Sequence, residues 1–99
     1  MNFKDTLSCY EAIGETLANA APAGWSNIEA EIKLSGIQID AVVSYIEASG
    51  SSGNLTGVPM LARYFYELAR LVSTEDKGLF KSCTFSLQSS GKYDAKFIY

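Results

Sequence analysis

The chain has 99 residues, of which 47% are hydrophobic and 19% charged, and eleven acidic against eight basic residues give a net charge of −3. This length supports one domain over residues 1–99 with a single core. The acidic balance opposes non-specific binding to a phosphate backbone, so we expect no direct nucleic-acid ligand. No apolar run approaches the roughly 20 residues of a membrane span, and acids interrupt the N-terminal stretch where a signal peptide needs an apolar core. We therefore expect a cytoplasmic protein without membrane contact.

The chain contains no histidine, which removes several classes of chemistry. A Ser-His-Asp triad, a Cys-His pair and histidine-based metal sites all need that side chain. The two cysteines, Cys9 and Cys83, lie far apart and form no C-x-x-C motif, so we expect both to be reduced core residues. No nucleophile–base pair is evident, and we predict neither an enzyme nor a bound cofactor or metal.

Residues 3–20 have the pattern of an amphipathic helix. Its apolar residues recur at steps of three and four and form one stripe: Phe3, Leu7, Tyr10, Ile13, Leu17 and Ala20. Pro22 and Gly24 end the helix, because proline cannot continue it and glycine suits a reversal. Gly14 lies inside the helix, where glycine costs about 1 kcal/mol relative to alanine. We interpret it as a close contact with a neighbouring element.

Two strands are predicted next, over residues 25–34 and 37–46, because apolar and polar residues alternate in both. Ser35-Gly36 is the expected tight turn between them. Val42 and Ile46 interrupt the polar face of the second strand. They are either ordinary exposed residues or part of a contact surface.

Residues 47–58 are rich in glycine and serine, which predicts a loop. The loop is longer than most connections in compact domains, and we interpret it as mobile rather than functional. A second helix follows, opened by Pro59 at its first position. Its apolar stripe consists of Leu61, Tyr64, Phe65, Leu68, Leu71 and Val72. Tyr66 lies off this stripe, so we expect it to be exposed.

Residues 83–99 predict a second hairpin with a strict alternation in both arms. The segment 89–92 between the arms contains Gly91, which can adopt a positive φ, so a tight turn is expected. One face of the hairpin is apolar and should be buried: Cys83, Phe85, Leu87, Tyr93, Ala95, Phe97 and Tyr99. The element order is therefore helix–strand–strand–helix–strand–strand. We predict an α+β two-layer sandwich of αββαββ order, with a four-stranded antiparallel sheet and both helices on one face.

The candidate site is a group of acids on the polar face of the sheet: Glu29, Glu31, Asp40 and Asp94. With the turn at Ser35-Gly36, Glu31 would face Asp40, and Lys33 would relieve the repulsion. Three interpretations stay open: a solvated acidic face, a docking patch for a basic protein, or a paired general acid and base. An open sheet face offers no desolvation to separate two pKa values, which weakens the last.

The order of several motifs resembles the YezG-like immunity proteins, bacterial antitoxins encoded beside secreted polymorphic toxins that are often nucleases. The motifs are Ala23-Gly24-Trp25 before an alternating strand, the helix with Leu61, Phe65 and Leu68, and Thr84-Phe-Ser-Leu with Ser90-Gly-Lys-Tyr and Phe97-Ile-Tyr99. The chain departs from the family pattern at Phe80-Lys81, where members tend to carry a tryptophan. The resemblance covers nearly the whole chain. It implies stoichiometric occlusion of a cognate toxin C-terminal domain, a basic protein, in the cytoplasm of the producing cell.

Under that resemblance the four acids are the expected partner-binding residues, because an acidic surface complements a basic toxin. The loop 48–58 is the alternative surface. Two other classes of function also remain. One is a dimeric structural module that adds a strand across an open sheet edge, and the other is a small-ligand binder that uses the helix–sheet cleft. The sequence leaves the oligomeric state open.

Overall fold

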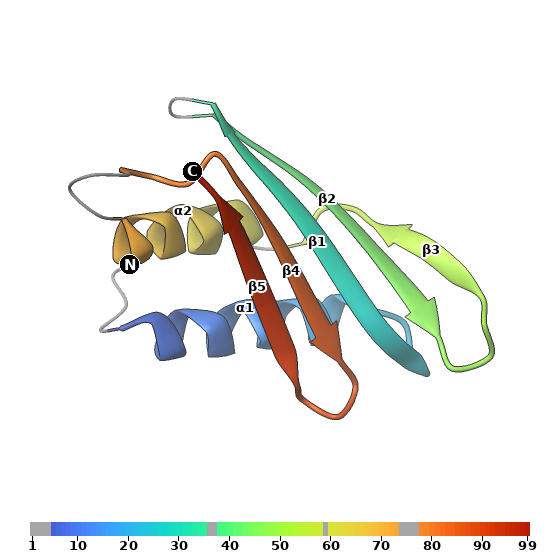
Figure 1. The fold of residues 1–99 in the computed structure, drawn as a ribbon. Coiled ribbons are helices and arrows are strands. Elements are labelled where there is room, and N and C mark those ends of the chain that lie inside the picture. The colour runs from blue at the N-terminus through green and yellow to red at the C-terminus, as the bar shows by residue number, and fades with distance from the viewer. Residues whose placement is uncertain (1–4, 36–37, 59, 74–77) are drawn as a thin grey trace.

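The computed structural model describes residues 5–35, 38–58, 60–73 and 78–99. They form two helices and one five-stranded antiparallel sheet, shown in Figure 1. The elements in chain order are α1 (Thr6–Ala20), β1 (Trp25–Ser35), β2 (Gln38–Glu47), β3 (Ser52–Leu55), α2 (Leu61–Val72), β4 (Ser82–Gln88) and β5 (Tyr93–Ile98). The predicted α+β class is confirmed.

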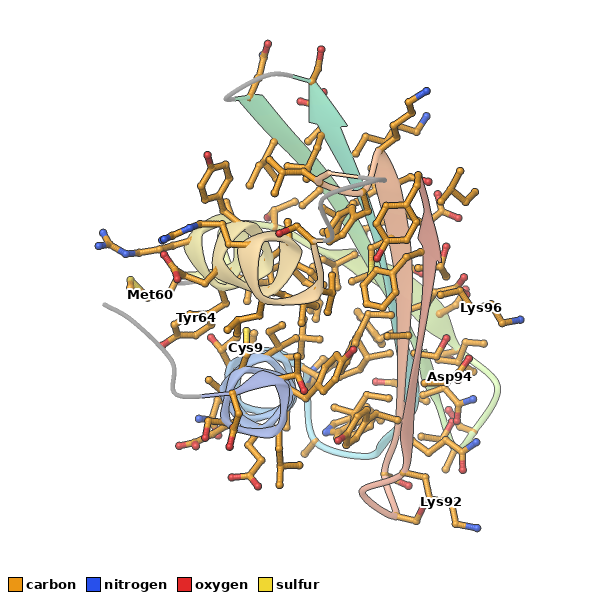
Figure 2. All side chains as sticks on the ribbon, turned by 60° about the vertical axis from the view of Figure 1, so that its left-hand side comes forward. Cys9, Met60, Tyr64, Lys92, Asp94 and Lys96 are labelled. Carbon is orange, nitrogen blue, oxygen red and sulfur yellow. The ribbon has the colours of Figure 1, made fainter. Side chains whose placement is uncertain are left out.

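The strands lie in the order β3-β2-β1-β4-β5, so β1 is central and the two hairpins are joined through β1 and β4. Both helices pack side by side on one face of this sheet (Figures 1 and 2). The opposite face is covered by none of the described elements. We call it the outer face.

The prediction of four strands in αββαββ order is wrong in one element, because part of the predicted loop is a strand. Residues 52–55 pair with the end of β2, with Leu55 opposite Val43 and Gly53 opposite Tyr45. Leu55 and Val58 pack against the core, so this segment is anchored rather than mobile. A Cβ atom at Gly53 would lie 2.6 Å from Tyr45 Oη, so the present position of the Tyr45 ring depends on glycine at residue 53.

The predicted register of the first hairpin is also wrong. β1 continues to Ser35 and β2 begins at Gln38, so the turn lies one residue later than expected. The turn residues themselves, Gly36 included, lie outside the described residues. Moving the turn by one residue shifts the pairing of the two strands by two residues. Every side chain therefore stays on its face of the sheet but lies opposite a different residue. Lys33 now lies opposite Asp40, which replaces the predicted pair of like charges by opposite ones.

The core fills the space between the helices and the inner face of the sheet. Helix α1 contributes Cys9, Ile13 and Leu17, and α2 contributes Leu61, Phe65, Leu68 and Ala69. The Phe65 ring meets the Phe85 ring edge-on at 5.9 Å. The structure corrects two expectations. Leu7, placed in the apolar stripe of the first helix, is 55% exposed, and Tyr93, expected in the buried face of the last hairpin, is 42% exposed.

Gly14 does not have the role predicted for it. A Cβ atom at this position would meet only Leu87, at 3.9 Å, which is ordinary van der Waals contact. No close approach therefore requires glycine here.

The ends of the helices show how local sequence sets their limits. Asp5 caps α1 by accepting a hydrogen bond from the Ser8 backbone N–H at 2.9 Å, which lowers the pKa of its carboxyl. Helix α2 begins at Leu61, after Met60 in the left-handed conformation with φ of 64°. Pro59, predicted to open this helix, lies outside the described residues.

The last hairpin has the predicted tight turn. The Gly91 N–H donates to the Gln88 carbonyl at 2.9 Å, and the Gln88 N–H donates to the Lys92 carbonyl at 2.8 Å. Gly91 has φ of 96°. A turn followed by a glycine bulge is a usual way to close a three-residue hairpin loop, and it requires glycine at the bulge.

Candidate functional site: an uncovered acidic sheet face

The outer face carries alternate side chains of all five strands. Its rows follow from the strand register. One row runs across Asn54, Ser44, Glu29, Ser86 and Asp94, and the next across Val42, Glu31, Thr84 and Lys96. A third row holds Asp40, Lys33, Ser82 and Ile98. Figure 2 shows Asp94 and Lys96 pointing away from both helices, which places them on this face.

All four predicted acids lie on the outer face and are exposed. Glu29 and Glu31 project from the central strand, so they lie in the middle of the sheet. Asp94 shares a row with Glu29 and is separated from it by Ser86, about 10 Å away across two strand spacings. Asp40 is opposite Lys33 and is the diagonal cross-strand neighbour of Glu31.

The immediate neighbours of the central acids are hydroxyls and one valine. Glu29 lies between Ser44 and Ser86, and Glu31 lies between Val42 and Thr84. Within the described ranges, none of the four acids forms an ion pair. Among the described residues, no ion pair therefore offsets the charge of Glu29, Glu31 or Asp94, whereas Asp40 has Lys33 as its cross-strand neighbour.

Apolar side chains interrupt this polar surface. Val42 is 62% exposed and Ile46 is 49% exposed, and both were recognised from the sequence as breaks in the pattern of β2. A hollow of about 90 Å³ lies beside Ile46, lined by Asn27, Glu29, Ser44, Ile46 and Ser86 among others. The centre of the outer face thus combines carboxylates, hydroxyls and exposed aliphatic groups, a mixture suited to a protein partner.

Sequence reasoning missed two parts of this face, the exposed Ile98 on β5 and the whole of strand β3. Ile98 on β5 is 65% exposed, although alternation in the last hairpin already placed it with Asp94 and Lys96. Ser52 and Asn54 of β3 lie next to Ile46 and Ser44. The segment 48–58, predicted as an alternative surface, therefore borders the acidic face and continues it.

Further hollows lie on the helix side. One of them has a volume of about 540 Å³ and lies between α2 and β2, lined by Ile39, Ala62, Arg63, Tyr66 and Glu67. Tyr66, predicted to be exposed, is half-buried beside it. The Arg70 guanidinium is 3.2 Å from the Glu67 carboxylate, one turn further along the helix. Small-ligand binding in this cleft stays a prediction.

The two thiols are structural. Cys9 and Cys83 are free and buried, as predicted. Cys9 Sγ donates a hydrogen bond to the Tyr64 carbonyl at 3.3 Å and so links α1 to α2 (Figure 2). Burial raises the pKa of Cys9 to about 11 and that of Cys83 to about 12, which keeps both protonated near neutral pH.

Three further observations concern metal binding, membrane spans and similarity to known proteins. In the part of the chain that the structure describes, no three His, Cys, Asp or Glu side chains are grouped so as to hold a metal ion. Neither of the described helices is long and apolar enough to cross a membrane. Comparison with known protein families and with curated proteins gives no match. The resemblance to YezG-like immunity proteins therefore stays a prediction.

Proposed function

We propose that this chain is an immunity protein, an antitoxin that binds and neutralises a cognate secreted toxin by stoichiometric occlusion. The observation that carries the proposal is the uncovered outer face, with Glu29 and Glu31 at its centre and Val42 and Ile46 beside them. An inhibitor without turnover acts by covering its target, and a broad bare sheet face provides the surface to do so.

A basic protein is the partner that this face fits best. A toxin domain that acts on nucleic acid carries positive charge where it meets phosphates. Carboxylates that lack ion-pair partners on the described surface would attract that region and speed the encounter, while the exposed aliphatic side chains would be buried in the complex. The resemblance noted from the sequence supports the same partner and places the action in the cytoplasm of the producing cell.

Protection of cells tests the function. The secreted protein encoded beside this gene supplies the candidate toxin, and its C-terminal domain is expressed in bacteria with and without this chain. We expect colonies to survive only when the chain is present and the two proteins to purify together at equal stoichiometry. Cell death despite folded chain in the cells would contradict the proposal.

Charge reversal tests the surface. Glu29→Lys with Glu31→Lys should weaken toxin binding about 100-fold in calorimetry, because the substituted side chains would repel a basic partner. Glu11→Lys with Glu15→Lys is the matched control, since both glutamates are exposed on α1 and the net charge changes equally. The control should stay within about threefold of the parent. Equal weakening by both variants would show that net charge matters and that the outer face does not.

A further inference from the structure

Strand β5 (Tyr93–Ile98) is an edge strand of the five-stranded sheet, and β4 is the described strand that pairs with it. A free strand edge presents unpaired N–H and C=O groups that can pair with another strand. The opposite edge strand, β3, has only four residues and is the poorer template. β5 also exposes two large apolar side chains, Tyr93 at 42% and Ile98 at 65%.

The hydrogen bonds of the last hairpin determine which backbone groups of β5 are free. The bond from the Gln88 N–H to the Lys92 carbonyl makes these two residues a bonded pair. Bonded and non-bonded pairs alternate along an antiparallel ladder, so Asp94 and Lys96 direct their backbone groups to β4. The backbone groups that point away from the sheet belong to the residues in the other phase: Tyr93, Ala95 and Phe97.

The side chains of β5 would complement those of a second β5 strand that pairs through these free backbone groups. Two β5 strands that pair antiparallel about a two-fold axis at Ala95 bring the free backbone groups of each copy together as bonded pairs. Asp94 of each copy then lies opposite Lys96 of the other, on the outer face. Tyr93 lies opposite Phe97 of the other copy on the inner face. Opposite charges and aromatic rings are both favourable cross-strand neighbours.

Across the described residues, neither Asp94 nor Lys96 takes part in an ion pair, and Figure 2 shows both extending into open space on the outer face. A two-fold axis at Tyr93 would also oppose charges, since Lys92 would face Asp94. It would bring Gly91 into the ladder, however, and the φ of 96° at Gly91 is not that of a strand. The axis at Ala95 is therefore preferred.

We propose that the chain forms a symmetric dimer in which β5 pairs with β5 of a second copy and joins the two sheets edge to edge. The inference does not rest on the proposed function, because it concerns the sheet edge and leaves both outer faces uncovered. An interface of one strand from each copy is small, so the dimer is weak and concentration-dependent.

Sedimentation of the full chain over a dilution series tests the proposal. We expect reversible dimerisation. Lys96→Asp should raise the dimer dissociation constant about tenfold or more, because two acids then face each other at both symmetric positions. The exchanged variant, Asp94→Lys with Lys96→Asp, should restore the affinity to within about threefold, since the charges again oppose. Both residues are exposed, so these variants are expected to fold.

Amide hydrogen exchange provides a second, site-specific readout. Dimerisation should protect the amides of Tyr93, Ala95 and Phe97 as the concentration rises, whereas those of Asp94 and Lys96 are already bonded to β4. Ala95→Pro removes the central donor and should abolish dimerisation while the monomer stays folded, because proline is tolerated at a solvent-facing edge position. A chain that stays monomeric up to about 1 mM, or a dimer unaffected by Lys96→Asp, overturns the proposal. The proposal is also overturned if the amides of residues 93–97 are equally protected at every protein concentration.

Discussion

The contact between β3 and Tyr45 can be tested by adding one methyl group. A Cβ atom at Gly53 would lie 2.6 Å from Tyr45 Oη and 2.9 Å from its Cζ, well inside van der Waals contact. The Tyr45 ring is half-buried and packs against the core, so moving it aside would cost packing contacts. We expect Gly53→Ala to lower the free energy of unfolding by about 1–3 kcal/mol, the usual cost of overpacking.

The same substitution at Gly14 is a control of opposite sign. The added Cβ would lie 3.9 Å from Leu87 Cδ1, so there is room for it, and the residue lies in the middle of α1. Because alanine is favoured over glycine inside a helix, Gly14→Ala should raise the free energy of unfolding by about 0.5–1 kcal/mol. Urea unfolding followed by circular dichroism measures both changes in one assay.

A double-mutant cycle assigns the cost to the Tyr45 ring. Tyr45→Leu removes the ring tip, so the cost of Gly53→Ala should fall to near zero in that background. A Gly53→Ala variant as stable as the parent would refute the reasoning. An equal cost in both backgrounds would also refute it, because residues 52–55 would then not pack on Tyr45.

Three further predictions concern the core, the hairpin register and the thiols. Phe85→Ala should cost about 3–5 kcal/mol in urea unfolding, because its buried ring contacts Tyr10, Phe65 and Tyr93. Tyr93→Ala should cost clearly less, since that side chain is 42% exposed, and an equal cost would contradict the exposure. Asp40→Lys should destabilise by about 0.5–1 kcal/mol by placing two lysines opposite each other, and adding Lys33→Asp should recover the loss if the register is right. Burial raises the pKa of Cys9 to about 11 and of Cys83 to about 12, so the unfolded chain releases these protons at lower pH than the folded chain. Stability should be intact below pH 9 and fall as the pH approaches 11 to 12, and the Cys9→Ala and Cys83→Ala variants should each lose part of this dependence in unfolding titrations at several pH values.

Alternation of apolar and polar residues was sufficient to predict four of the five strands and the face that each side chain occupies. It failed for β3 for a physical reason. The strand is four residues long, and its inward position at Gly53 is kept empty for the Tyr45 ring. Leu55 is then the apolar side chain that remains at an inward position of this strand, too little for an alternating pattern to be recognised. Asn54 beside it is also a typical turn residue.

The sequence was sufficient to predict which face of the sheet carries the acids, but not which residues lie opposite each of them. Because successive side chains of a strand point to opposite faces, Glu29, Glu31 and Asp40 lie on the polar face in either register. Which residue lies opposite each acid depends on the position of the turn, and moving the turn by one residue changes the partner of Glu31 from Asp40 to Val42. Alternation cannot distinguish the two registers, because both keep the same residues inward.

The strand order could not be predicted from the sequence either. It separates the acidic middle of the outer face from the edge at β5, where charges of both signs alternate. Because β1 is central, Glu29 and Glu31 lie in the middle of the outer face, where a partner that covers the sheet would meet them. Because β5 is an edge, Asp94 and Lys96 lie where a neighbouring strand would align, and their charges balance each other. An excess of one sign favours a partner of opposite charge, whereas alternating signs along an edge favour a second copy of the same strand. The two proposed interactions can therefore occur at once, because a dimer joined through β5 would keep both acidic faces open on the same side of one continuous sheet.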